Sequence, residues 1–432
     1  MDRQAGWLAA ASGPDRTDRT DRTDRGTLPH LELGTAAYRR TCRALFVAGF
    51  CAFSVLYVAQ GTLPAVGAEF HVSPTEASLT VSLTTLPLAL GVVLAASISE
   101  RRGRLGLLVG SLLAAALCTV AAAASPTFIV LLALRVLTGL SLAALPAVAM
   151  AYVAEEVSVR SLGSAMGLYI GATGFGGMTG RLLGGLLAGL STWRVSLAVV
   201  GLIALCGGLY VASQLPASAH FEPQPEGLLR QLAAARVHLG DAVLLRLFGC
   251  GFALMGSMVA FFNYLLYRLE ARPFGLSQQA AATVFVLYAA GTLSANWLGR
   301  LTDRRPRRSV LLLGMGIMTV GLAVSLANVL ALVLIGTALT TFGFFGAHAV
   351  ASGWVNARAR SRRAQASSLY LLFYHLGSSL LGVLGGLAFG AGGWNGLVLL
   401  LALPMVFAVG AALSLPRVVV PRIGAIESGS EP

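Results

Sequence analysis

Long apolar stretches separated by short polar connections make up almost the whole chain. About 20 apolar residues cross a bilayer as a helix. A bilayer-spanning segment must pair its own backbone groups, which favours helices. The pattern therefore predicts an all-α membrane protein with twelve transmembrane helices. The stretches lie near 43–65, 77–98, 106–125, 128–152, 163–190, 195–214, 243–267, 277–298, 309–327, 328–351, 365–390 and 394–415.

A short basic block occurs twice, each time between two apolar stretches. The first copy begins Glu100-Arg101-Arg102 and the second Asp303-Arg304-Arg305, and both continue with any residue and then Arg. One further segment repeats at a single offset, so the halves are expected to be two pseudo-symmetric six-helix bundles. Duplicated bundles with a cleft between them are typical of transporters. The matching pairs are Ala165/Ala366, Leu168/Leu369, Tyr169/Tyr370, Gly184/Gly385, Gly185/Gly386, Leu186/Leu387 and Trp193/Trp394.

The polar segments divide the chain into five parts. Residues 1–38 carry an Asp-Arg-Thr repeat without an apolar core, which indicates a disordered tail and no signal peptide. Residues 215–242 contain three prolines and are expected to link the amino-terminal bundle, 39–214, to the carboxy-terminal bundle, 243–415. Residues 416–432 form a second tail.

Charge is sparse and unevenly placed. Only 11% of residues are charged, the net charge is +13, and every cation is an arginine. The arginines gather in alternate connections, while the opposite connections hold only Arg194, Arg268 and Arg272. This asymmetry follows the positive-inside rule and predicts a multi-pass protein of the inner or plasma membrane with both termini in the cytoplasm. It also argues against nucleic acid as the partner of the basic residues.

The sequence lacks the residues that several classes of protein require. A phosphate-binding Gly-x-x-x-x-Gly-Lys loop needs lysine, so the chain itself cannot drive transport with ATP. No His-Glu-x-x-His, Gly-x-Ser-x-Gly or paired intramembrane acids occur, so we expect no enzyme. The five cysteines have no metal-ligand spacing, and we expect no metal and no cofactor. A non-transporting membrane sensor is a remote alternative, because the tails are short.

The second basic block runs Gly299-x-x-x-Asp303-Arg304-x-x-Arg307-Arg308 and resembles the loop signature of the major facilitator superfamily. The first copy departs from it, since Ala96 stands for the glycine and Leu105 for the last arginine. The resemblance implies alternating access and a cytoplasmic gate. Glu155, at the cytoplasmic end of the fourth stretch, is the expected partner of Arg101 or Arg104. The alternative is that these arginines only determine the orientation of the helices in the membrane. The gate residues we expect are Glu100, Arg101, Arg104, Glu155, Asp303, Arg304 and Arg307.

Two arginines lie inside apolar stretches, where a charge costs about 2.5–3.5 kcal/mol. Arg135 lies four residues before Gly139, which resembles the superfamily's motif in the fourth span. Arg181 lies between Gly177 and Gly185. We expect both arginines to contact substrate, although each could instead cap backbone carbonyls or extend outward to the membrane surface.

The fifth stretch is rich in glycine and resembles the corresponding motif of bacterial drug–proton antiporters. That motif normally contains Gly-Pro, and this stretch has no proline. Its Gly177-x-x-Gly180-Arg181 is closer to the YnfM-like group of inner-membrane transport proteins, which are loosely associated with arabinose and drug efflux permeases.

Polar side chains at similar depth complete the candidate substrate site. His375 could also carry a proton, since histidine titrates near neutral pH. The other candidates are Tyr57, Gln60, Tyr169, Tyr370 and Tyr374.

These observations favour a secondary active transporter, with proton-coupled efflux of drugs, sugars or metabolites as the leading function. Uptake of a small organic anion or sugar is the alternative, because two intramembrane arginines would attract an anion and repel a cationic drug. We expect a monomer in the lipid bilayer that is driven by the proton gradient.

Overall fold

A computed structural model describes residues 29–221, 236–359 and 363–416, without the side chains of several residues near the end of the second helix and of 363–364. The described chain is almost entirely helical. Its helices are α1 (Ala36–Phe70), α2 (Pro74–Arg102), α3 (Arg104–Ala123), α4 (Phe128–Leu142), α5 (Leu145–Glu156), α6 (Val159–Leu190), α7 (Trp193–Gln214), α9 (Ala242–Glu270), α10 (Gln278–Ala282), the 3-10 helix η1 (Thr283–Tyr288), α11 (Ala289–Leu301), α12 (Arg307–Val324), α13 (Leu330–Arg358) and α14 (Arg363–Leu413).

The lengths of these helices are consistent with twelve membrane crossings. Within the described ranges, nine helical stretches are both long and apolar enough to span a bilayer. One of them, in α14, is two crossings joined at a kink. Gly393 stands there at φ 57°, a left-handed conformation that glycine adopts without a steric penalty. The less apolar α2 and α6, with 29 and 32 residues, are also long enough to cross.

Two crossings are interrupted where the sequence predicted continuous helices. The fourth is divided between α4 and α5, and Pro146 lies in the first turn of α5. A proline there cannot donate a hydrogen bond to the preceding turn, which explains the break. The eighth crossing consists of α10, η1 and α11 in succession, so its middle turn is wound more tightly.

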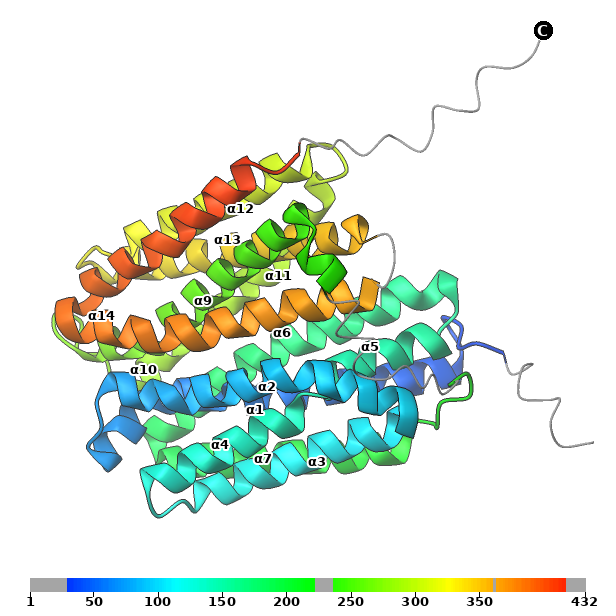
Figure 1. The fold of residues 1–432 in the computed structure, drawn as a ribbon. Helices are drawn as coiled ribbons and strands as arrows, with labels where there is room; N and C mark the ends of the chain where they lie inside the picture. Colours follow the sequence, from blue (N-terminus) through cyan, green and yellow to red (C-terminus); the bar gives the residue numbers. More distant parts are fainter. Residues whose placement is uncertain (1–28, 222–235, 360–362, 417–432) are drawn as a thin grey trace, which may run out of the picture.

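The helices form two bundles that lie against each other (Figure 1). The first holds α1 to α7 and the second α9 to α14. The described parts of the chain begin and end at the same end of the molecule. We call this the termini end. The turn in the middle of α14 lies at the opposite end.

The two bundles repeat the same packing in detail. A Cβ on Gly49 in α1 would lie 3.1 Å from the ring of Tyr169, and one on Gly251 in α9 would lie 2.7 Å from the ring of Tyr370. Tyr169 and Tyr370 are one of the pairs matched in the sequence. The sequence repeat therefore corresponds to a structural repeat, in which a tyrosine packs on a glycine of the first helix of its bundle.

Contacts between the bundles are concentrated toward the opposite end. Among the described residues, the hydrogen bonds that join the halves come from the last third of α1, the first half of α2 and the end of α6. The bonded pairs are Gln60–Val259, Gln60–Asn263, Leu63–Tyr267, Gly61–Gln278, Ser78–Gly382, Ser82–Ser379, Thr85–Ser379 and Gly189–Gln279.

Candidate functional site

Arg181 lies between the two bundles and is almost fully buried, with 3% of its surface exposed. Its guanidinium carbon is 3.7 Å from the ring centroid of Tyr57 on α1 and 4.5 Å from that of Tyr288 on η1. Its Nε donates to the Gln60 side-chain oxygen, and its Nη1 donates to the Gly177 carbonyl at 2.7 Å. The cation is therefore held by two neutral oxygens of the amino-terminal bundle and by one aromatic ring from each bundle.

Gln60 connects this arginine to the second bundle. Its amide nitrogen donates to the Asn263 side-chain oxygen at 2.6 Å and to the Val259 carbonyl at 3.1 Å, both on α9. All atoms of this chain of hydrogen bonds are buried. The sequence prediction that Tyr57, Gln60 and Arg181 share a site agrees with their positions, while their contact with substrate stays a prediction.

A second cluster of rings lies in the carboxy-terminal bundle. His348 Nδ1 and the Tyr370 hydroxyl are 2.9 Å apart, and Tyr374 lies with its ring centroid 4.8 Å from His348. His375 packs edge-on against Tyr374 at 5.1 Å, and its Nδ1 has no partner among the described residues. The predicted residues Tyr370, Tyr374 and His375 are thus neighbours.

Ring contacts join this cluster to the arginine. Tyr288 packs edge-on against Phe345 at 5.8 Å, Phe345 against Phe344 at 5.0 Å, and Phe344 against Tyr374 at 6.3 Å. The sequence analysis did not single out Tyr288, Phe344 or Phe345. Tyr288 could have been found from its position in the middle of a predicted span. The chain has only 10 tyrosines, so a tyrosine at that depth is notable.

Arg135 lies outside this site and is fully buried within the amino-terminal bundle. Its Nε donates to the Thr80 carbonyl at 3.1 Å, its Nη1 to Val55 at 3.3 Å and its Nη2 to Leu56 at 2.9 Å. All three nitrogens are therefore occupied by carbonyls of α1 and α2. The geometry favours the alternative of carbonyl capping over the predicted substrate contact.

Tyr169 also lies within one bundle, against Gly49 of α1. Its hydroxyl is buried and has no partner among the described residues. Its predicted contact with substrate is not tested by this position.

At the termini end, Arg104 and Glu155 form the predicted pair. Arg104 Nη2 lies 2.6 Å and Nε 3.2 Å from the two Glu155 oxygens, which is a two-point contact. Arg104 Nη1 also donates to the Ser99 hydroxyl at 2.6 Å. The pair ties together α2, α3 and α5. The predicted gate residues Glu100 and Arg101 have side chains outside the described part of the structure.

The second half carries a different ion pair at the same end. Arg358, at the end of α13, lies 2.8 Å from Asp241, which caps α9 by accepting from the Val243 and Leu244 amides. Burial alone would raise the pKa of Asp241, but Arg358 and the two amides outweigh it and hold that pKa below its usual value. The sequence analysis did not find this pair, because the acid precedes α9 rather than following the tenth span.

The other predicted gate residues of the second half stand apart. Asp303 and Arg304 are exposed in the turn after α11, and Arg307 begins α12. Among the described residues, none of the three forms an ion pair in this conformation.

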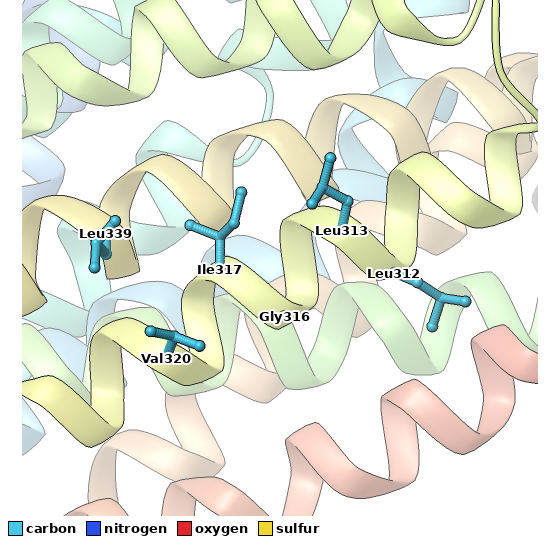
Figure 2. A pocket seen from close by; sticks show the side chains of 6 residues that line it. All are labelled: Leu312, Leu313, Gly316, Ile317, Val320 and Leu339. Carbon is cyan, nitrogen blue, oxygen red and sulfur yellow. The ribbon is translucent and has the colours of Figure 1, made fainter.

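An apolar groove of about 390 Å³ lies elsewhere, on α12 and α13 (Figure 2). Its lining offers no charged or hydrogen-bonding side chain, so it suits hydrocarbon contact. It is lined by Leu312, Leu313, Gly316, Ile317, Val320 and Leu339.

Two six-helix bundles that enclose a polar and aromatic centre define a membrane transporter. A sequence profile of the Major Facilitator Superfamily matches residues 45–306 and 247–430. The chain belongs to this superfamily, and the fold class expected from the sequence is confirmed.

The chain is similar in sequence to several known proteins along most of their length. The chain is 41% identical over 371 residues to the MFS-type transporter YybF of Bacillus subtilis (strain 168), which covers 86% of this chain and 92% of YybF. It is 39% identical to the inner membrane transport protein YnfM of Escherichia coli (strain K12), over 88% of this chain and 91% of YnfM. A chloramphenicol resistance protein of Streptomyces lividans is 25% identical over 60% of this chain and 65% of that protein.

Solved structures show the same fold. A bacterial homologue of the human lysosomal transporter Spinster, inward-facing and occupied, superimposes with a TM-score of 0.70 at 18% identity, covering 88% of this chain and 96% of that one. A D-xylose–proton symporter also gives a TM-score of 0.70, at 15% identity, covering 88% of this chain and 99% of that one.

Proposed function

We propose that this protein is a secondary active transporter that exports small molecules by alternating access, driven by the proton gradient. The observation that carries the proposal is the position of Arg181. This buried cation lies at the junction of the two bundles, and transporters built from two repeats bind their cargo at that junction. The chloramphenicol resistance protein among the relatives supports export over import.

The contacts between the bundles support one conformation of the cycle. They lie toward the opposite end. At the termini end, each described ion pair joins residues of a single bundle and none connects the two bundles. The arginine asymmetry supports a cytoplasmic termini end. The conformation described here is then inward-facing, and transport requires the contacts near the opposite end to open.

The test is accumulation of chloramphenicol and of dyes in a bacterial host that lacks its main efflux pumps. We expect the wild-type protein to lower accumulation and a protonophore to restore it, because removing the gradient removes the driving force. Arg181→Gln at matched membrane abundance should accumulate like the empty host. Unchanged accumulation in wild-type cells across the panel would reject export of these compounds.

A specific observation favours import of an organic anion as the second candidate. Arg181 is positively charged and has no acidic partner among the described residues, so it would repel a cationic drug. Cells that express the protein would then take up radiolabelled organic acids faster than control cells.

The two-point ion pair at the termini end gives a separate prediction. Arg104→Gln or Glu155→Gln is expected to slow transport about fivefold, because a partly buried pair contributes about 1 kcal/mol. The swap of both residues, Arg104→Glu with Glu155→Arg, should recover part of the rate. Arg304→Gln removes an exposed arginine without an ion pair among the described residues and should have a smaller effect. Equal losses in all of these variants would argue against a gate at Arg104.

A further inference from the structure

We infer that the guanidinium of Arg181 binds the anionic group of the transported molecule, and that the cargo is a small organic anion with a planar ring. This inference rests on the proposed function, because it takes the junction of the bundles as the transport site. It adds the charge and shape of the cargo and the atoms that recognise it.

The charge of Arg181 is uncompensated among the described residues. Its partners are the Gln60 side-chain oxygen, the Gly177 carbonyl and two tyrosine rings, all of them neutral. A buried ion without a counter-charge is costly, and an anion would remove that cost. The described arginines Arg104, Arg194 and Arg358 each face a carboxylate instead.

One nitrogen of the guanidinium is without a hydrogen bond among the described residues. Nε and Nη1 are engaged, whereas Nη2 has no hydrogen-bond partner among the described residues and is not enclosed by them. Arg135 differs, since all three of its nitrogens donate to carbonyls. Nη2 is therefore the atom of Arg181 that can donate a hydrogen bond to a carboxylate.

The surroundings suit a planar ligand. The rings of Tyr57 and Tyr288 lie 3.7 Å and 4.5 Å from the guanidinium carbon, so the site around the cation is aromatic. Tyr288 is 6% exposed, and its hydroxyl is buried without a partner among the described residues. That hydroxyl can donate to the anion, while the half-buried rings of Phe345 and Tyr374 offer surface for stacking.

Gln60 links occupancy of this site to the contact between bundles. Its oxygen accepts from Arg181, and its amide donates to Asn263 and Val259 on α9. An anion that draws the guanidinium away from Gln60 would loosen this connection. Anion binding would thus act on the junction that must open during transport.

The test uses purified full-length protein and three probes with one ring, namely benzoate, benzamide and benzylamine. We expect benzoate to bind at least about 30-fold more tightly than benzamide. This is the loss of affinity expected when one partner of a buried charge pair is removed. Benzylamine should bind more weakly still. Dissociation constants come from isothermal titration calorimetry, and thermal unfolding with each probe gives a second readout.

Variants assign the preference to one side chain. Arg181→Gln should remove the preference for benzoate, whereas Arg181→Lys keeps the charge and should retain part of it. Arg300→Gln makes the same chemical change at an exposed arginine and should bind benzoate like the wild type. Monodisperse elution and an unchanged unfolding temperature establish that each variant is folded.

Three results would overturn the inference: no benzoate binding by the wild type, equal binding of the three probes, or a preference that survives in Arg181→Gln. The outcome is separable from that of the export assay. Benzoate binding without export of chloramphenicol or dyes would leave the anion site standing and reject the export of those compounds. Export without any preference for anions would reject the anion site alone.

Discussion

Gly386→Leu is expected to slow transport about 100-fold by keeping the opposite end from closing. Gly386 lies on the first half of α14, against α2 of the other bundle. A Cβ at this position would lie 2.6 Å from the Thr75 hydroxyl oxygen and 2.7 Å from the Thr75 Cα. The Tyr264 hydroxyl, in the same bundle, is also close and is met in every conformation, but the clash with the Thr75 backbone exists only in the closed arrangement. Overpacking against backbone costs about 3 kcal/mol.

The same helix provides a matched control. Gly390 lies one turn further along α14, and a Cβ there meets no atom within 4 Å, so Gly390→Leu should transport like the wild type. The conformation can be followed with Thr85→Cys in a cysteine-free background, because the Thr85 hydroxyl lies 2.7 Å from Ser379 across the junction. A maleimide should label this cysteine faster in Gly386→Leu. Normal transport with a protected cysteine would show that closure does not depend on this contact.

Arg135→Lys is expected to lower the free energy of unfolding by about 3 kcal/mol and to reduce the amount of folded protein. Arg135 connects α4 to carbonyls on α1 and α2 through three nitrogens. Lysine is a point charge that cannot satisfy the same set, and each hydrogen bond to a charged group contributes about 1.5–3 kcal/mol. Thermal or denaturant unfolding of the purified protein measures the change.

The same experiment decides between two roles for Arg135. Loss of stability without ligand indicates a residue that positions α1 and α2, where α1 carries Tyr57 and Gln60. Unchanged unfolding together with lost transport would instead return Arg135 to the substrate site. Arg300→Lys, at an exposed position, is the control for the chemical change and should leave unfolding unaffected.

Much of the fold could be predicted from the sequence because the bilayer acts on it directly. Apolar runs of about 20 residues must become helices, and the repeated basic block and the Tyr169/Tyr370 pair predicted two related bundles. The pair of Arg104 and Glu155 was also predictable, since both residues lie at helix ends on the same side. The break at Pro146 shows local chemistry acting within a span, and Gly393 shows it at the turn between two spans.

Only the tertiary structure separated the two intramembrane arginines. Arg135 and Arg181 both stand in apolar, glycine-flanked sequence, and nothing nearby distinguishes them. The difference lies in partners from distant helices, which are three carbonyls for Arg135 and the ring of Tyr288 for Arg181. Every residue has a carbonyl, so a carbonyl partner leaves no mark in the sequence. Which carbonyls a guanidinium reaches is decided by how the helices pack.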